Sequence, residues 1–133
     1  MQSGLNYLSI SGVISEIAPT TIDNNSGITT TAGTIKVTDI SKFHSTIGGS
    51  AIGNTNPGFI RILGTEEDGS GDEIIAYKEI DTSVNPKVIK FATNGRNHNG
   101  ISGSATGKTH AQNAIVQCYN FDGIPLTKIN KTH

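Results

Sequence analysis

The stretch from Asp72 to Phe91 (DEIIAYKEIDTSVNPKVIKF) constrains the fold most strongly, because it has the pattern of a β-hairpin. Glu73–Ile80 has the composition of a strand, and Asp81–Pro86 supplies turn-forming residues. Lys87–Phe91 returns with β-branched residues as the second strand. Successive strand side chains point to opposite faces. One face of the first strand would carry Ile74, Ala76, Lys78 and Ile80, and the other Glu73, Ile75, Tyr77 and Glu79.

An isolated hairpin is barely stable in water, so these two strands must belong to a larger β-structure. Composition indicates the same, because the chain has 40 Ile, Val or Thr residues against 13 Leu, Ala or Met residues. Side chains branched at Cβ lose rotamer freedom in helices and pack well on sheets. The prediction is an all-β fold, a small antiparallel β-sandwich or barrel-like domain. With 16 Gly and 34% hydrophobic residues, we expect a small core and long Gly/Asn/Thr-rich loops.

The 133 residues fit one β-rich domain. Within it, residues 1–33 are a candidate extended N-terminal arm, and residues 124–133 are a candidate connector to a further C-terminal part. Besides the hairpin, apolar patterns predict strands at Leu5–Ile17, Thr34–Val37, Phe59–Leu63, Ala114–Asn120 and Ile124–Ile129, and a capped helical turn at Thr38–Phe43. Ala18–Gly33 is turn-rich, with Ile22 and Ile28 as apolar anchors on either side of an Asn-Ser-Gly turn.

Charge and cysteine content exclude several classes of protein. The formal net charge is −1 and the basic residues are scattered singly, which argues against nucleic-acid binding. Cys118 is the only cysteine, so no intramolecular disulfide framework is expected, and we interpret Cys118 as a small buried hydrophobe. The N-terminal sequence lacks the pattern of a signal peptide, and no segment has the length of a membrane span.

Three strings resemble binding sites without meeting their requirements. Gly103–Thr109 resembles a phosphate-binding loop, but three residues separate its glycines where the motif needs four. The four histidines (His44, His98, His110 and His133) are far apart, although His98 and His110 share one loop. The acidic run Glu66–Glu73 lacks the alternating register of a calcium loop. We interpret these residues as solvated loop residues and predict neither a metal site nor a cofactor.

The catalytic inventory is equally poor, because no Ser or Thr lies in a strand–turn–helix elbow and Cys118 has no sequence neighbour that lowers its pKa. The prediction is that the chain is not an enzyme and acts by binding or assembly. Its two long Gly-rich loops, Ile47–Gly58 and Ala92–His110, are expected to contact partners, because such loops usually serve a function. The partner-contact candidates are Asn54, Asn56, Arg96, His98 and His110. The predicted core or interface anchors are Phe59, Tyr77, Phe91, Tyr119 and Phe121.

The C-terminal half resembles a segment of tailed-bacteriophage structural proteins, in which an EIIxY strand leads to an RGxxGTxxxxH loop and a GAxV strand. The matching residues are Glu73, Ile74, Ile75, Tyr77, Gly95, Arg96, His110, Ala114 and Val116. The chain departs from this pattern in the inverted Gly95–Arg96 order, in an expanded loop, and in Asn113, where Gly is usual. The C-terminal DGIPLTKINKTH also resembles virion proteins of large marine phages, including those that infect cyanobacteria.

The resemblance implies a structural component of the virion, in the tail, baseplate, neck or fibre-attachment region. Such a component would assemble in the host cytoplasm by packing against copies of itself, as a trimer or hexamer, and against other virion proteins. It carries no catalytic residues to transfer. Two alternatives remain open, a capsid decoration or cementing protein and a carbohydrate-binding module for host-surface recognition. The absence of Trp and the presence of only three Tyr weigh against the module.

Overall fold

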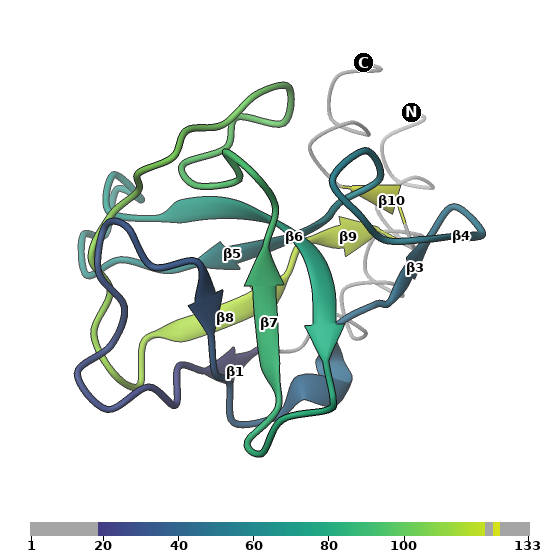
Figure 1. Ribbon diagram of the computed structural model, residues 1–133. Helices are drawn as coiled ribbons and strands as arrows, with labels where there is room; N and C mark the ends of the chain where they lie inside the picture. Colours follow the sequence, from purple (N-terminus) through teal and green to yellow (C-terminus); the bar gives the residue numbers. More distant parts are fainter. Residues whose placement is uncertain (1–18, 122–123, 126–133) are drawn as a thin grey trace, which may run out of the picture.

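The computed structural model describes residues 19–121 and 124–125, and these residues form an all-β structure, as predicted (Figure 1). One short 3-10 helix, η2 (Ile40–Lys42), accompanies the strands, and its N-cap Asp39 confirms the predicted capped turn. No helix in the described part of the chain is long and apolar enough to cross a membrane. The strands are β1 (Thr20–Thr21), β2 (Thr34–Ile35), β3 (Thr46–Ile47), β4 (Ser50–Ala51), β5 (Gly58–Ile62), β6 (Glu73–Asp81), β7 (Val88–Phe91), β8 (Ile115–Cys118), β9 (Asn120–Phe121) and β10 (Ile124–Pro125).

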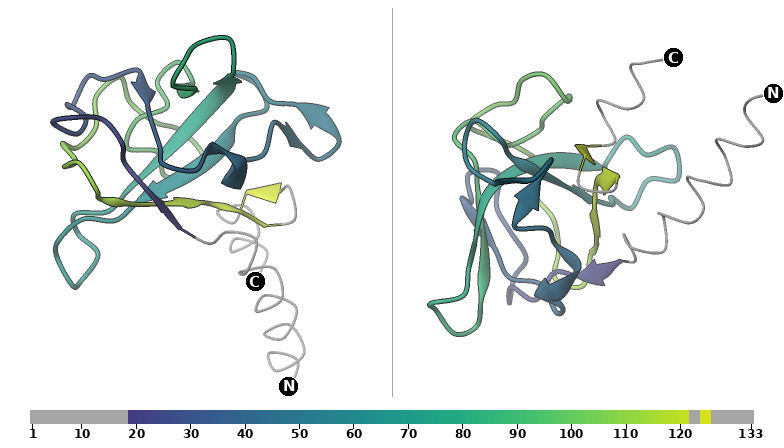
Figure 2. Two further views of the ribbon diagram at one scale, coloured as in Figure 1. Left: turned by 90° about the horizontal axis from the view of Figure 1, so that it is seen from below. Right: turned by 90° about the vertical axis from the view of Figure 1, so that its right-hand side faces the viewer.

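Six strands form one antiparallel sheet in the order β1-β8-β5-β6-β7-β2. The sheet curls strongly, which Figures 1 and 2 show from three directions. Its two edges meet in a bridge between Ile22 and Val37. Backbone hydrogen bonds flank this bridge, from Asp23 to Lys36 at 2.9 Å and from Thr38 to Thr21 at 3.0 Å. The predicted barrel-like arrangement is therefore observed, with two separate small pairs, β3-β4 and β9-β10.

The predicted hairpin is β6 and β7, which lie between β5 and the edge strand β2. Tyr77 pairs with Phe91 and Ile80 with Ile89, with a bulge between Tyr77 and Glu79. On its other side β6 pairs with β5 along five residues. A bulge increases local twist and bends a strand, and β6 turns sharply along its length in Figure 1. Through this bend β6 reaches both sides of the curl.

The core fills the inside of the curled sheet and consists mostly of isoleucine. Its fully buried members include Ile22, Ile35, Ile60, Ile62, Ile75, Tyr77, Ile89, Val116 and Cys118. Phe59, Tyr77 and Phe91 are buried core residues, whereas Tyr119 is half-buried. For Phe121 the structure describes the backbone of β9 alone. Both Phe59 and its neighbour Ile60 are buried, because the His98 ring covers Phe59 with ring centroids 5.0 Å apart.

The predicted N-terminal arm is wrong for residues 19–33. Thr20–Thr21 pairs with β8, and Ile22 and Ile28 are buried, so their apolar side chains bring this turn-rich segment into the core. The Asn-Ser-Gly turn is present, with positive φ at Ser26 and Gly27. Residues 1–18, which include the predicted strand at Leu5–Ile17, lie outside the described residues. So does the part of the predicted final strand and connector that follows Pro125.

Candidate functional site: a buried carboxylate network

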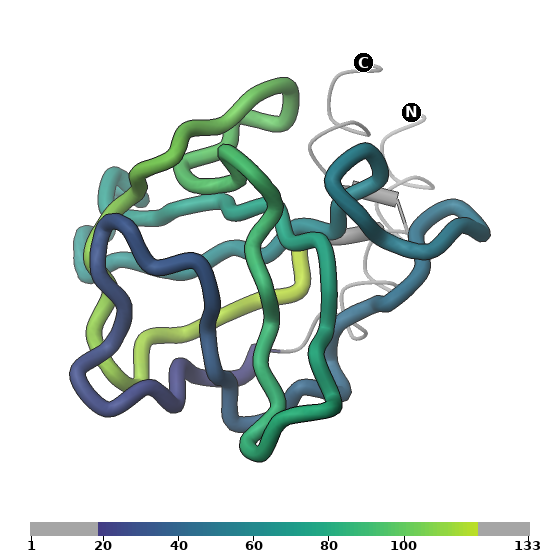
Figure 3. The backbone as a smooth tube through the Cα atoms, viewed as in Figure 1, coloured from purple at the N-terminus to yellow at the C-terminus, as the bar shows by residue number. Residues whose placement is uncertain are grey.

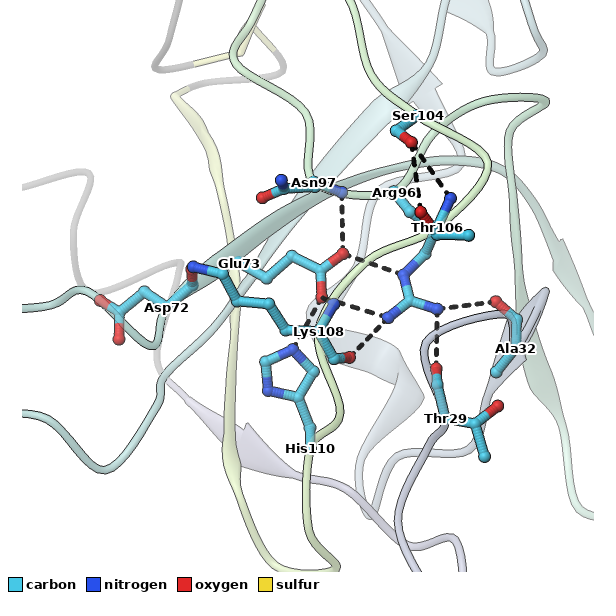
Figure 4. Close-up of polar contacts among 10 residues, drawn as sticks. All are labelled: Thr29, Ala32, Asp72, Glu73, Arg96, Asn97, Ser104, Thr106, Lys108 and His110. Carbon is cyan, nitrogen blue, oxygen red and sulfur yellow. Dashed lines mark hydrogen bonds and ion pairs between the residues drawn. The ribbon is translucent and has the colours of Figure 1, made fainter.

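Glu73, Arg96 and His110 meet inside the molecule although they are 23 and 37 residues apart in the sequence (Figure 4). Glu73 begins β6 and its side chain points inward, as strand alternation places it on the face of Ile75 and Tyr77. Arg96 follows β7 in the long Gly-rich loop, and His110 ends that loop before β8. Their exposed fractions are 1%, 3% and 4%. An ion pair this deeply buried requires complete hydrogen bonding to be tolerated.

Arg96 uses all five of its N–H donors. Nε and Nη2 donate to the two carboxylate oxygens of Glu73, at 2.9 and 3.1 Å. Nη2 also donates to the backbone oxygen of Lys108 at 2.8 Å, and Nη1 donates to those of Thr29 and Ala32 at 3.0 Å each. A guanidinium has five donors in a fixed plane, so Arg96 joins two other segments, at residues 29–32 and at Lys108, to the start of β6.

The Glu73 carboxylate is equally well satisfied. Besides Arg96, it accepts hydrogen bonds from the Asn97 amide at 2.8 Å, the Lys108 amide at 2.9 Å and His110 Nε2 at 2.8 Å. Burial alone raises the pKa of a carboxyl. Here the hydrogen bonds from His110, Arg96 and the two amides outweigh burial and lower the pKa of Glu73 from 4.5 to about 2. Glu73 is therefore ionised at neutral pH and is a poor general base.

The state of His110 follows from that of Glu73. An ionised carboxylate only accepts hydrogen bonds, so Nε2 of His110 carries a proton and donates it to Glu73. The backbone of His110 pairs with Ile28 in both directions, at 2.8 and 3.1 Å. His110 thus connects the end of the long loop to the segment that follows β1.

Two local features allow the loop to approach Glu73. Gly107 has no room for a side chain, because an added Cβ would overlap a carboxylate oxygen of Glu73 and the guanidinium of Arg96. Asn97 has a φ of 47°, in the left-handed region that Asn tolerates, and its amide is bonded to Glu73. The guanidinium of Arg96 also makes a favourable cation–π contact, because its Cζ lies 5.6 Å from the centroid of the Phe91 ring.

The string that resembles a phosphate loop has an internal partner. The Lys108 amide binds the Glu73 carboxylate, and Lys108 Nζ donates to the backbone oxygens of Ser70 and Asp72 at 2.7 and 2.8 Å. The amide that a phosphate would need is therefore committed to the chain's own carboxylate. No group of three or more His, Cys, Asp or Glu side chains that could hold a metal ion occurs among residues 19–121.

The structure corrects part of the predicted contact set. Arg96 and His110 were expected on an exposed loop, but both are buried, because the ionised Glu73 carboxylate attracts them inward. The same finding overturns the interpretation of His110 as a solvated loop residue. His98 is half-buried, packs on Phe59 and accepts a hydrogen bond from the Gly100 amide at 2.9 Å. Burial lowers the pKa of His98.

The two asparagine candidates bind backbone groups of the chain itself. Asn54 is exposed, and its Oδ1 accepts a hydrogen bond from the Thr93 amide at 2.8 Å. Asn56 is half-buried, and its Nδ2 donates to the backbone oxygens of Ile47, Ser50 and Ala51 at 3.1, 3.3 and 3.3 Å. Asn54 thus links the two long loops, and Asn56 holds the base of β3–β4.

An open groove of about 880 Å³ lies beside the network. It runs between the loop that follows β5 and the segment that leads into β8, and Leu63, Lys108, His110, Ala111 and Ile115 are among its lining residues. Its exposed wall is mainly apolar.

The interpretation of Cys118 as a small buried hydrophobe is confirmed, since Cys118 is fully buried. Its Sγ lies 3.5 Å from His44 Nδ1.

The donors of Arg96 and both oxygens of Glu73 are already used within the chain. The network therefore acts as a brace: it fixes the loop Ala92–His110, called the braced loop below, to the start of β6. Sequence reasoning did not find it, but one signal was available. Glu73, Arg96 and His110 are the acidic and basic residues of the string in which the chain resembles phage proteins. Searches of protein-family models, curated proteins and solved structures produced no match to this chain.

Proposed function

We propose that this chain is a structural component of a tailed-bacteriophage virion, in the tail, baseplate, neck or fibre-attachment region, and that it acts by packing against copies of itself and other virion proteins. One observation carries the proposal. The acidic and basic residues of the phage-like pattern, Glu73, Arg96 and His110, make one closed network. A network that holds loops in place is a structural role for these residues. This role supports the proposal, because particle proteins act through the shape of their surfaces.

The brace suits a protein that works by contact. A small core supports few ordered loops by apolar burial alone. Here a buried charge network supplies additional fixed points, because Arg96 and Glu73 together bind the segments around residues 30, 97 and 108. A loop ordered before binding loses little conformational entropy when a partner docks. The braced loop is therefore a suitable contact surface.

The described side chains give no support to a carbohydrate-binding module. Such modules usually stack sugars on exposed aromatic rings. The rings of Phe43, Phe59, Tyr77 and Phe91 are buried, and of the Phe and Tyr side chains the structure describes, only Tyr119 is half-buried.

Light scattering on the purified chain across a concentration series tests the self-packing part of the proposal. A trimer or hexamer is expected, because particle tails and fibres are built on three-fold and six-fold axes. A folded monomer at every concentration would contradict packing against copies of itself.

The place in the particle needs a second experiment. An antibody raised against the purified chain would be used to gold-label phage particles whose genome encodes it. Gold at the tail, baseplate or neck is the expected result under electron microscopy. Gold over the capsid shell would replace the proposal with a decoration protein, and unlabelled particles would refute a virion role.

A further inference from the structure

Asn99 and Gly100 lie at the tip of the braced loop, in the part around residue 100 that projects at the top of Figure 3. Asn99 is exposed to water, and Gly100 is half-buried with a φ of +94°, a conformation that few other residues adopt. In an Asn-Gly pair the backbone nitrogen of Gly can approach the side-chain amide carbon of Asn closely, because Gly has no Cβ in the way. The groups that surround this pair determine how fast those two atoms react.

The turn polarises the side-chain carbonyl of Asn99. Its Oδ1 accepts hydrogen bonds from the amides of Ile101 and Ser102, at 2.9 Å each. Two backbone amides directed at one carbonyl oxygen form the arrangement that stabilises the oxyanion in acyl transfer. The Asn99 amide donates to the backbone oxygen of Ser102 at 3.0 Å and closes the turn. The side-chain carbon of Asn99 is therefore activated toward a nucleophile.

His98 provides a base at the nitrogen of Gly100. Its Nδ1 accepts a hydrogen bond from the Gly100 amide at 2.9 Å, so Nδ1 carries no proton. Burial lowers the pKa of His98, which keeps the ring neutral at neutral pH and able to accept a proton. The ring also packs edge-to-face on Phe59, with ring centroids 5.0 Å apart, and this contact fixes its position.

We propose that Asn99 is a site of self-modification, at which His98 accelerates the conversion of Asn99 to aspartate or isoaspartate. His98 Nδ1 takes the proton of the Gly100 amide while the Gly100 nitrogen forms a bond to Cγ of Asn99. The bond between Cγ and Nδ2 then breaks, and Nδ2 leaves with the bonding electrons and the proton from His98, as ammonia. A succinimide ring remains, and water opens it at either carbonyl. The reaction neither oxidises nor reduces the chain, and water is its only co-reactant.

The product would change the surface of the braced loop. Residues 97–104 contain no Asp, Glu, Lys or Arg, so the reaction would introduce a negative charge into an uncharged tip. The isoaspartate product would also lengthen the backbone by the Cβ of residue 99. The inference goes beyond the proposed function and does not depend on it, because the reaction takes place within one chain.

Asn94 and Gly95 form a matched control in the same loop, as the other Asn-Gly pair of the sequence. Asn94 is also exposed. The Gly95 amide, however, donates to the backbone oxygen of Ala92 at 2.9 Å, and the Gly95 oxygen accepts from the Ala76 amide at 2.9 Å. A backbone oxygen is no base at neutral pH. The two pairs therefore share their chemistry and differ in their surroundings.

Mass spectrometry of peptides from the purified chain, aged at neutral pH and sampled over time, measures both rates. In the folded chain Asn99 is expected to convert at least about 10-fold faster than Asn94, because a positioned base typically contributes about 100-fold or more. In concentrated urea at the same pH, Asn99 should slow down and the two pairs should convert at similar rates. Equal rates in the folded chain, or an Asn99 rate in urea that matches or exceeds the folded rate, would overturn the inference.

Two variants test the role of His98, each checked for folding by circular dichroism. His98→Asn retains an acceptor oxygen for the Gly100 amide but removes the base, so the rate at Asn99 should fall at least about 10-fold while that at Asn94 stays unchanged. His44→Asn, at another half-buried histidine, should leave both rates unchanged. A wild-type rate at Asn99 in His98→Asn would refute the assigned base. The comparison of Asn99 with Asn94 needs no variant and stands even if His98→Asn does not fold.

Discussion

The segments Ala92–His110 and Ile47–Gly58 have similar composition, rich in Gly and Asn, but different structural support. The first is tied to the core through Arg96 and His110, which both bind the buried Glu73 carboxylate. The second carries the β3–β4 hairpin, which projects from the body at the right of Figure 1. Its hydrogen bonds come from the Asn56 side chain, from the pairing of β3 with β4, and from backbone bonds between Ile52 and Ser45 and between Gly53 and Asn56. Asn54 adds one bond to the Thr93 amide of the first segment. None of these bonds involves a buried charge.

Composition therefore does not determine how firmly a loop is held. Gly48 and Gly49 at the β3–β4 turn have open space around them and φ values of +61° and +83°. Gly107 in the braced loop has a carboxylate and a guanidinium against it. In one segment glycine permits a tight turn, and in the other it permits close approach to a buried ion pair. The substitutions below test this difference, from the largest expected effect to the smallest.

Glu73→Gln should have the largest effect. The change keeps the side-chain shape but removes the charge that balances Arg96, and it turns an amide nitrogen toward existing donors. Breaking one partner of a buried ion pair typically costs about 3–5 kcal/mol. Urea unfolding followed by circular dichroism should show a loss of this size in the free energy of unfolding.

Glu79→Gln is the matched control, on the same strand but exposed, with Lys90 at 3.8 Å as its ion-pair partner. Exposed ion pairs contribute little, so this variant should unfold like the wild type. Equal losses for the two variants would show that position on β6, rather than the buried network, determines stability.

Acid should weaken the braced loop by a similar mechanism. The pKa of Glu73 is lowered from 4.5 to about 2 in the folded state, so its contribution is fully present above pH 4.5 and is lost as the pH falls toward 2. A shift of this size corresponds to roughly 3 kcal/mol. The free energy of unfolding, measured in urea between pH 6 and pH 2, should fall steeply over that interval.

The Glu73→Gln variant separates this group from the others. Asp72 also has a lowered pKa, because hydrogen bonds from the Gly64 amide and Arg61 outweigh the opposing effect of burial. A residual decline in stability is therefore expected in the variant. Parallel pH profiles of the variant and the wild type would refute the assignment of the main acid effect to Glu73.

Gly107→Ala should destabilise by about 1–3 kcal/mol, the usual cost of overpacking. The added methyl group would push the Glu73 carboxylate and the Arg96 guanidinium apart. Gly53→Ala, in the segment that carries β3–β4, is the control, because its added Cβ meets nothing within 4 Å. Melting temperatures of the two variants give the comparison. A wild-type melting temperature for Gly107→Ala would mean that the loop is looser than described.

Asn56→Ala should have the smallest and most local effect. It removes the hydrogen bonds to the backbone oxygens of Ile47, Ser50 and Ala51, a loss of about 1 kcal/mol. Amide exchange in residues 46–51 should accelerate while the melting temperature changes little. Thr55→Ala, at an exposed neighbouring position, is the control. Slower or unchanged exchange in Asn56→Ala would contradict the role of Asn56 as the support of β3–β4.

Local patterns were sufficient to predict much of the fold. The β6–β7 hairpin, β5 and β8 have apolar patterns long enough to be recognised, and strand alternation placed Glu73 on the same side as Ile75 and Tyr77. Strands β3 and β4 have two residues each, too few for any alternation to be visible. Ile22 and Ile28 were identified as anchors, but their burial depends on closure of the sheet edges, which sequence neighbours do not reveal.

The contacts among Glu73, Arg96 and His110 could not be predicted from neighbouring residues, for a different reason. An arginine and a histidine in a Gly-rich loop have the pattern of solvated residues. Whether they are buried depends on a carboxylate 23 and 37 residues earlier in the chain. Only the phage-like pattern placed Glu73, Arg96 and His110 in one string, and it carried no indication that they touch. The structure supplies that contact.

Amide hydrogen exchange, resolved by residue, tests the central contrast most directly. The amides of Asn97 and Lys108 donate to the Glu73 carboxylate, so both should exchange only on global unfolding, while Gly48 and Gly49 should exchange rapidly through local opening. The protection of Asn97 and Lys108 is expected to approach the free energy of unfolding and to be lost in Glu73→Gln. Exchange of Asn97 and Lys108 as fast as that of Gly48 and Gly49 would contradict this expectation.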